Sequence, residues 1–186
     1  MDGVRMKGMV FTSFLEMVEN KFSLHIVDQI IENSDLPSGG SYTSVGTYGH
    51  HEMIQLVVQL SQRTNIPVAD LVRTFGEYLF TQLIELHPQF IQENSSVFSF
   101  LQKVDSYIHV EVRKLYPGAE LPAFEYETPV PGTLIMSYRS SRPFADLAEG
   151  LINGCIQYYG ENINMVRENL DEGTAARFIL TEAEVK

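Results

Sequence analysis

The sequence predicts an α+β fold, with a helical N-terminal lobe followed by an antiparallel sheet that has one helix inserted between its strands. Through residue 116, apolar residues recur mostly every three or four positions, which is the spacing of a helix with one buried face. Beyond Pro122 the spacing changes to alternation, which is typical of half-buried strands. Helices and strands segregated along the chain in this way favour α+β.

The N-terminal lobe begins with two predicted helices over residues 7–34. Val10 and Phe14 recur at helical spacing in the first, and Leu24 and Val27 do so in the second. Their plainest role is to form a core.

A loop and two further helices follow. Residues 34–49 contain Pro37 and four glycines and show no helical period, so we expect a loop there. A helix is expected over residues 52–63 and another over residues 67–86, because a proline is favourable in the first turn of a helix. His87 and Pro88 end the second of these helices.

The clearest predicted helix spans residues 97–115, after a polar break at residues 93–96 and before Tyr116-Pro117-Gly118. Its apolar stripe comprises Val97, Phe100, Leu101, Val104, Ile108, Val112 and Leu115.

The C-terminal part is predicted to hold four strands, one hairpin turn and one amphipathic helix. We expect the last two strands to pair antiparallel through a turn at residues 171–173. The strands cover residues 124–128, 133–140, 163–170 and 175–181, and the helix covers residues 144–158.

Length and composition indicate one soluble globular domain over residues 1–186. The chain has 44% hydrophobic and 20% charged residues, which are ordinary values for a globule. Its formal net charge of −11 repels phosphate backbones and anionic headgroups, so neither nucleic acid nor a membrane surface is an expected partner. No run approaches the roughly 18 apolar residues of a membrane helix, and charged residues interrupt the N-terminus. We therefore expect a cytoplasmic protein.

Cys155 is the only cysteine, so the chain cannot form an intramolecular disulfide or a zinc ribbon. Any metal must be held mainly by other ligands.

His109 is the strongest candidate ligand among five histidines. It lies at the edge of the apolar stripe, beside Ile108 and three residues before Val112. A neutral imidazole in such surroundings can bind iron or zinc when its second nitrogen has a hydrogen-bond partner. The periodicity alone leaves open that His109 is simply a core residue.

Three polar residues near the end of a predicted strand form a second constellation. Alternation places Tyr138, Ser140 and Arg142 on one face, where their side chains can converge on carboxylate oxygens. Arginine suits that role because its planar guanidinium binds carboxylates with two parallel hydrogen bonds. The residues alone also fit a solvated surface. No GxSxG, HExxH, Walker or GxGxxG pattern occurs in the chain, which argues against the corresponding enzymes.

Together these residues resemble the signature of the haem-nitric oxide/oxygen-binding (H-NOX) family. The pattern Tyr-x-Ser-x-Arg begins 29 residues after His109, and the opening Met6-Lys7-Gly8 is also similar to that family. The resemblance runs from Met6 to about Ile179.

The resemblance implies haem b between a distal helical lobe, about residues 1–65, and a proximal helix-and-sheet lobe, about residues 66–186. His109 would be the only protein ligand of the iron. Tyr138, Ser140 and Arg142 would hold the propionates. Pro122 matches the proline that presses on the porphyrin in the family, although a helix-to-strand turn would also explain it.

On the gas-binding side, the resemblance implies a pocket in which every matching residue of this chain is apolar. These residues are Val10, Phe14, Leu79, Leu147 and Leu151. Without the resemblance, all five would be read as core residues. Oxygen-binding members carry a tyrosine at the position of Leu147, so the leucine favours nitric oxide over dioxygen. Carbon monoxide is an expected ligand in vitro.

The resemblance therefore implies a sensor and not an enzyme. Nitric oxide would weaken or break the bond between iron and His109, and the lobes would shift. The output would lie in a separate protein, a histidine kinase or a cyclic-di-GMP enzyme. The alternatives are an oxygen- or redox-responsive haem protein, a peroxidase-like enzyme, which would need polar groups in the gas pocket, and an interaction module that has lost its haem.

Overall fold

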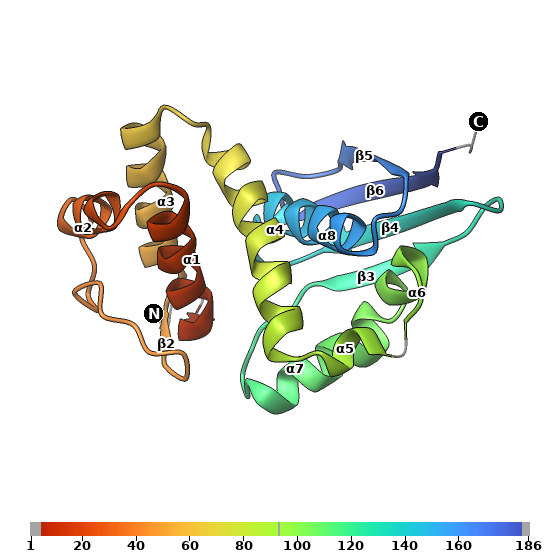
Figure 1. Cartoon of the computed structure of the whole chain (residues 1–186), viewed down its shortest axis with the longest axis horizontal. Coiled ribbons are helices and arrows are strands. Elements are labelled where there is room, and N and C mark those ends of the chain that lie inside the picture. The colour runs from red at the N-terminus through yellow and green to blue at the C-terminus, as the bar shows by residue number, and fades with distance from the viewer. Residues whose placement is uncertain (1–4, 93, 184–186) are drawn as a thin grey trace.

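The computed structural model of the protein describes residues 5–92 and 94–183. Residues 1–4 and 184–186 of the predicted domain, and Glu93 in the predicted break, lie outside the described residues. The α+β prediction is confirmed: Figure 1 shows helices α1–α3 grouped on one side, the larger sheet on the other, and α4 running between them.

The N-terminal helices agree with the sequence pattern. The predicted pair over residues 7–34 and the two helices after the loop are all present. They are α1 (Gly8–Lys21), α2 (Leu24–Glu32), α3 (His50–Thr64) and α4 (Val68–Leu86). Asn65 ends α3 in the left-handed conformation with φ 57°, which separates it from α4.

The predicted loop over residues 34–49 is wrong at its end. Strand β2 (Thr47–Gly49) pairs antiparallel with β1 (Arg5–Lys7), with Met6 opposite Tyr48. Neither strand is long enough to alternate visibly, so only the tertiary contact between distant segments creates the pair. The loop also supplies the carbonyls of Ser44 and Gly46 to the first N–H groups of α1, at 3.0 and 2.9 Å.

The predicted continuous helix over residues 97–115 is also wrong. The segment forms α6 (Val97–Leu101), a π-helical turn η1 (Val104–Ile108) and α7 (His109–Leu115). The carbonyl of Lys103 accepts hydrogen bonds from both Tyr107 N at 2.9 Å and Ile108 N at 3.1 Å. The second bond spans five residues and defines the wider turn. The apolar stripe survives the interruption, which explains why periodicity does not reveal it. A short helix, α5 (Gln89–Gln92), precedes the segment and was not predicted.

The predicted strands form one antiparallel sheet in the order β3-β4-β6-β5. The predicted pairing of the last two strands is confirmed, with Val166 opposite Ile179. The strands are β3 (Ala123–Glu127), β4 (Thr133–Arg139), β5 (Ile163–Asn169) and β6 (Ala175–Glu182), and the inserted helix is α8 (Ala145–Tyr159). The buried residues of β4 and β6, such as Met136 and Phe178, face the helices.

Two hydrophobic cores meet at α4. Leu71 and Phe75 pack into the core formed with α1–α3, whereas Phe80 and Ile84 pack into the core under the sheet. Helix α4 lies after the lobe boundary expected near residue 65 but contributes to both cores. The cores therefore do not divide the chain at that residue, and the boundary stays a prediction.

Helices α4 and α8 cross with their backbones in contact. A Cβ on Gly150 would lie 2.1 Å from the carbonyl oxygen of Arg73, and one on Gly76 would lie 2.6 Å from that of Leu147. Neither position accepts a side chain without separating the helices. No helix within the described ranges is long and apolar enough to cross a membrane.

Replacing Gly150 with alanine should destabilise the protein. A glycine-to-alanine change inside a helix ordinarily gains roughly 0.5–1 kcal/mol. Here the new Cβ meets backbone, and we expect a loss of about 1–3 kcal/mol in the free energy of unfolding. Urea unfolding measures it. Gln157→Ala, at an exposed position of the same helix, should change stability by less than about 0.5 kcal/mol. A Gly150→Ala protein as stable as the wild type would contradict the close crossing.

Candidate cofactor-binding site

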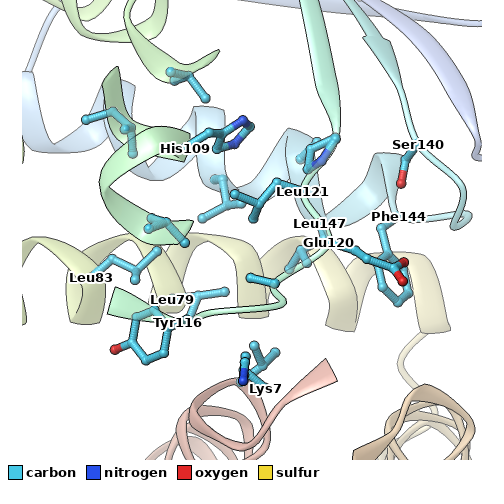
Figure 2. Close-up of a pocket in the computed structure, with 18 of the residues that line it drawn as sticks. Lys7, Leu79, Leu83, His109, Tyr116, Glu120, Leu121, Ser140, Phe144 and Leu147 are labelled. Carbon is cyan, nitrogen blue, oxygen red and sulfur yellow. The ribbon is translucent and has the colours of Figure 1, made fainter. Parts of the chain in front are cut away.

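A cavity of about 260 Å³ lies between the two hydrophobic cores and is lined by residues of both. In Figure 2, His109 faces it from α7, and Leu79 and Leu83 lie on α4 across from the histidine. Ser140 and Glu120 lie toward another end. The cavity thus has a histidine wall, an aliphatic wall and a polar end.

His109 is buried, and its side chain has a defined hydrogen-bond partner. Its Nδ1 lies 2.7 Å from Oδ1 of Asp105, and the other carboxylate oxygen of Asp105 accepts a hydrogen bond from Phe124 N at 3.0 Å. Burial lowers the pKa of His109, and the hydrogen bond to Asp105 opposes that shift only in part. A neutral imidazole that donates from Nδ1 keeps the lone pair of Nε2, the arrangement found in most metal-binding histidines.

Asp105 was not identified from the sequence as the hydrogen-bond partner of His109. It lies four residues before His109, the spacing at which side chains meet on one face of a helix, and this spacing could have identified it. The π-helical turn between them makes that spacing a weaker guide than it is in a regular helix. Asp105 also joins η1 to β3, so the orientation of His109 depends on the sheet.

Tyr138, Ser140 and Arg142 all line the cavity, but they do not share one strand face. Strand β4 ends at Arg139, so only Tyr138 is part of the strand, where it is 2% exposed. Ser140 and Arg142 lie in the turn that follows, and the Ser140 hydroxyl accepts a hydrogen bond from Arg142 N at 3.1 Å. The turn after β4, and not strand alternation, brings Ser140 and Arg142 to the same cavity as Tyr138.

Arg142 is buried, and not all of its guanidinium nitrogens have hydrogen-bond partners among the described residues. Its Nη2 donates to the carbonyl oxygen of Arg5 at 2.6 Å and to Oε2 of Glu120 at 2.9 Å, and the guanidinium lies 6.0 Å from the ring centre of Phe144. Its Nε is buried without a hydrogen-bond partner in the described part of the chain. A buried guanidinium N–H beside a cavity needs an acceptor, and a carboxylate of a bound cofactor would supply one. Arg5 and Glu120 were not identified from the sequence, because both contacts are non-local.

Four of the five predicted apolar residues line the cavity, namely Val10, Leu79, Leu147 and Leu151. Phe14 does not line it. It is fully buried in the core of the N-terminal helices, with its ring 5.3 Å from that of Phe75 at 87°. It lies one helical turn beyond Val10, and there α1 packs directly on α4.

Pro122 also lines the cavity, from the segment between α7 and β3. Its predicted alternative role, a connection between helix and strand, is compatible with that position. The residues as a set fit a planar apolar cofactor that has carboxylates at one edge and a metal that accepts one nitrogen ligand.

Comparison with known proteins agrees with this chemistry. A family model described as "Haem-NO-binding" matches residues 7–167. No curated protein matches the chain. Among solved structures, the Fe(II) unliganded H-NOX protein from K. algicida is 39% identical, with a TM-score of 0.90, over 97% of this chain and 98% of that one.

Two Shewanella structures are similar as well. The H-NOX from Shewanella woodyi, bound to IWP-051 in the Fe(II)CO state, is 46% identical, with a TM-score of 0.82 over 96% of this chain and 95% of that one. The H-NOX protein from S. oneidensis in the Fe(II)NO state is 25% identical, with a TM-score of 0.85 over 96% and 100%.

Removing the Asp105 carboxylate should weaken the fold as well as the site. Asp105→Ala leaves Phe124 N and His109 Nδ1 without their acceptor, and we expect a loss of about 1–3 kcal/mol in the free energy of unfolding. Denaturant unfolding measures it, with Glu111→Gln on α7 as a control that removes a partly exposed carboxylate. If both variants unfolded alike, Asp105 would not join η1 to β3 in the way described.

Proposed function

The chain belongs to the haem-NO-binding (H-NOX) family of haem-based gas sensors, and we propose on that premise that it senses nitric oxide and signals to a separate protein. The observation that carries the proposal is the division of the cavity. One wall presents an imidazole backed by a carboxylate, and the other presents the aliphatic side chains of Leu79, Leu147 and Leu151.

In this proposal, His109 Nε2 binds the iron, and Asp105 fixes the imidazole in the tautomer that can do so. Bound haem supplies a ferrous iron at which a diatomic gas binds. Tyr138, Ser140 and Arg142 hold the propionates, because two buried carboxylates require donors and a cation. The unpartnered Nε of Arg142 supports this role.

The preference for nitric oxide follows from the lack of a hydrogen-bond donor on the aliphatic wall. Dioxygen on ferrous iron gathers negative charge and depends on a hydrogen-bond donor, whereas nitric oxide depends on one much less. Leu79, Leu147 and Leu151 offer none, so the cavity favours nitric oxide because bound dioxygen is not stabilised by a hydrogen bond from this wall. The same absence of a donor disfavours a peroxidase-like activity.

Two tyrosines near this wall, Tyr78 and Tyr158, do not alter that conclusion. Tyr78 accepts hydrogen bonds from Asn20 and Gln82, and Tyr158 is 52% exposed; neither is among the described residues that line the cavity. Tyr116 does line it, from the end of α7, with its hydroxyl 3.5 Å from His87 Nε2.

Two contacts suit the proposed change in conformation. Asp105 ties the environment of His109 to β3, and Arg142 ties the turn after β4 to the backbone of Arg5 in β1. A displacement of His109 would therefore act on the sheet, and a displacement of Arg142 would act on the N-terminal helices. We propose that a histidine kinase or a cyclic-di-GMP enzyme reads the resulting shift.

Replacing His109 with glycine should abolish stable haem binding, because one imidazole is the only proposed bond from protein to iron. Added free imidazole should restore haem content by occupying the space. Absorption spectra with and without imidazole measure this, and His25→Gly, in the exposed first turn of α2, is the matched control. Unchanged haem content and an unchanged Soret band in His109→Gly would reject the ligand assignment.

Leu147→Tyr should strengthen dioxygen binding, since it adds a donor to the aliphatic wall. A neutral hydrogen bond contributes about 0.5–1.5 kcal/mol, so affinity should rise by up to about tenfold. The wild-type ferrous protein should form no stable dioxygen complex in air but should bind stoichiometric nitric oxide. Spectra in air and in nitric oxide measure both. Leu147→Phe controls for ring size; a stable dioxygen complex in it or in the wild type would contradict the donor argument.

A further inference from the structure

The charges at the polar end of the cavity do not balance with the residues so far assigned. Haem carries two propionates, and the Tyr-x-Ser-x-Arg pattern provides a single cation, Arg142. That cation, whose side chain is only 8% exposed, already contacts Glu120 at 2.9 Å, and the Glu120 side chain is 57% exposed. Glu120 can therefore reach water, but two propionates would have one buried guanidinium between them and would share it with Glu120.

Two more cations line the same cavity, Arg5 and Lys7. His109 cannot supply a positive charge there, because its proposed ligand role requires the neutral imidazole. Arg5 has no ion pair with a described carboxylate, and neither has Lys7, whose Nζ donates to Thr47 Oγ1 at 3.2 Å. Arg5, Lys7 and Arg142 together would match Glu120 and two propionates charge for charge.

The geometry of β1 supports a common role for the two side chains. Arg5 and Lys7 are two residues apart in a strand, so their side chains project to one face and that of Met6 to the other. Met6 is 7% exposed, packs into the N-terminal core and also lines the cavity, so the whole strand borders it. Pairing with β2 fixes the strand, and the hydrogen bond from Arg142 Nη2 holds the carbonyl of Arg5 at 2.6 Å. In Figure 2, Lys7 lies on the side of the cavity away from His109.

We propose that β1 is a second carboxylate-binding element of the cofactor site, in which Arg5 and Lys7 act with Arg142 on the two propionates. The inference rests on the proposed haem site and extends it to a residue that the family match, residues 7–167, does not include. Because β1 packs with the N-terminal helices and Arg142 follows β4, carboxylates held by both would tie the two hydrophobic cores together across the cavity.

The double variant Arg5→Gln/Lys7→Gln tests the proposal through haem loss and not through signalling. Haem transfer to excess apomyoglobin is followed by absorbance, at low and high ionic strength. We expect loss about tenfold faster than in the wild type at low salt, with a smaller difference at high salt. The control is Lys21→Gln/Arg63→Gln, which removes an equal charge from exposed positions on α1 and α3.

Haem dimethyl ester, which lacks the propionate charges, separates a carboxylate contact from a structural effect. The double variant and the wild type should lose the ester at equal rates. Faster loss of the ester from the double variant, or loss of haem no faster than from the control, would overturn the role of β1 while leaving the haem site intact. A wild-type protein that binds no haem would instead reject the proposed function itself.

Discussion

The backbone contact between α4 and α8 is the constraint on which the cavity depends. Gly76 and Gly150 leave no space for a Cβ, so the two helix backbones touch at the crossing. Since α4 packs into both hydrophobic cores, this crossing also fixes how the N-terminal helices sit relative to the sheet. Leu79 on α4 and Leu147 on α8 are held close to the crossing, and their spacing is set by backbone and not by adjustable side chains. A cavity wall held by backbone contact cannot easily widen.

The polar end of the cavity is governed by a different interaction, the burial of the Arg142 guanidinium. A buried cation is costly unless its donors are used, and here one nitrogen serves both the Arg5 carbonyl and the Glu120 carboxylate while Nε has no described partner. The arginine therefore joins the turn after β4, the segment after α7 and the N-terminal strand. Such a junction would make cofactor binding and the relative position of the two cores interdependent.

Periodicity predicted the helices and strands well because each buries one face against a core, and that requirement is local. It could not reveal the π-helical turn before His109, since the apolar stripe continues through it, nor the β1–β2 pair, whose strands of three residues have too little pattern. The histidine and the Tyr-x-Ser-x-Arg residues were identifiable from their spacing. Asp105, Glu120 and Arg5 were not identified, and the last two act through contacts with a residue distant in the chain. Phe14 was expected at the cavity but does not line it. It lies one helical turn after Val10, and there its ring packs against Phe75 in the core.

A cationic cavity end on a chain of net charge −11 has a consequence for selectivity. At physiological ionic strength charges are screened over about 8 Å, so an approaching anion meets mainly the acidic surface until it is close to Arg5, Lys7 and Arg142. Apart from the buried Arg142, a small free anion gains only exposed or partly exposed charge contacts there, each of which contributes at most about 1 kcal/mol. A porphyrin combines those contacts with burial of a large apolar ring, at about 25 cal/mol for each Å² removed from water. Charge and apolar walls are each weak criteria alone, and their conjunction in one cavity is what would select haem over the more abundant carboxylates and phosphates of a cell.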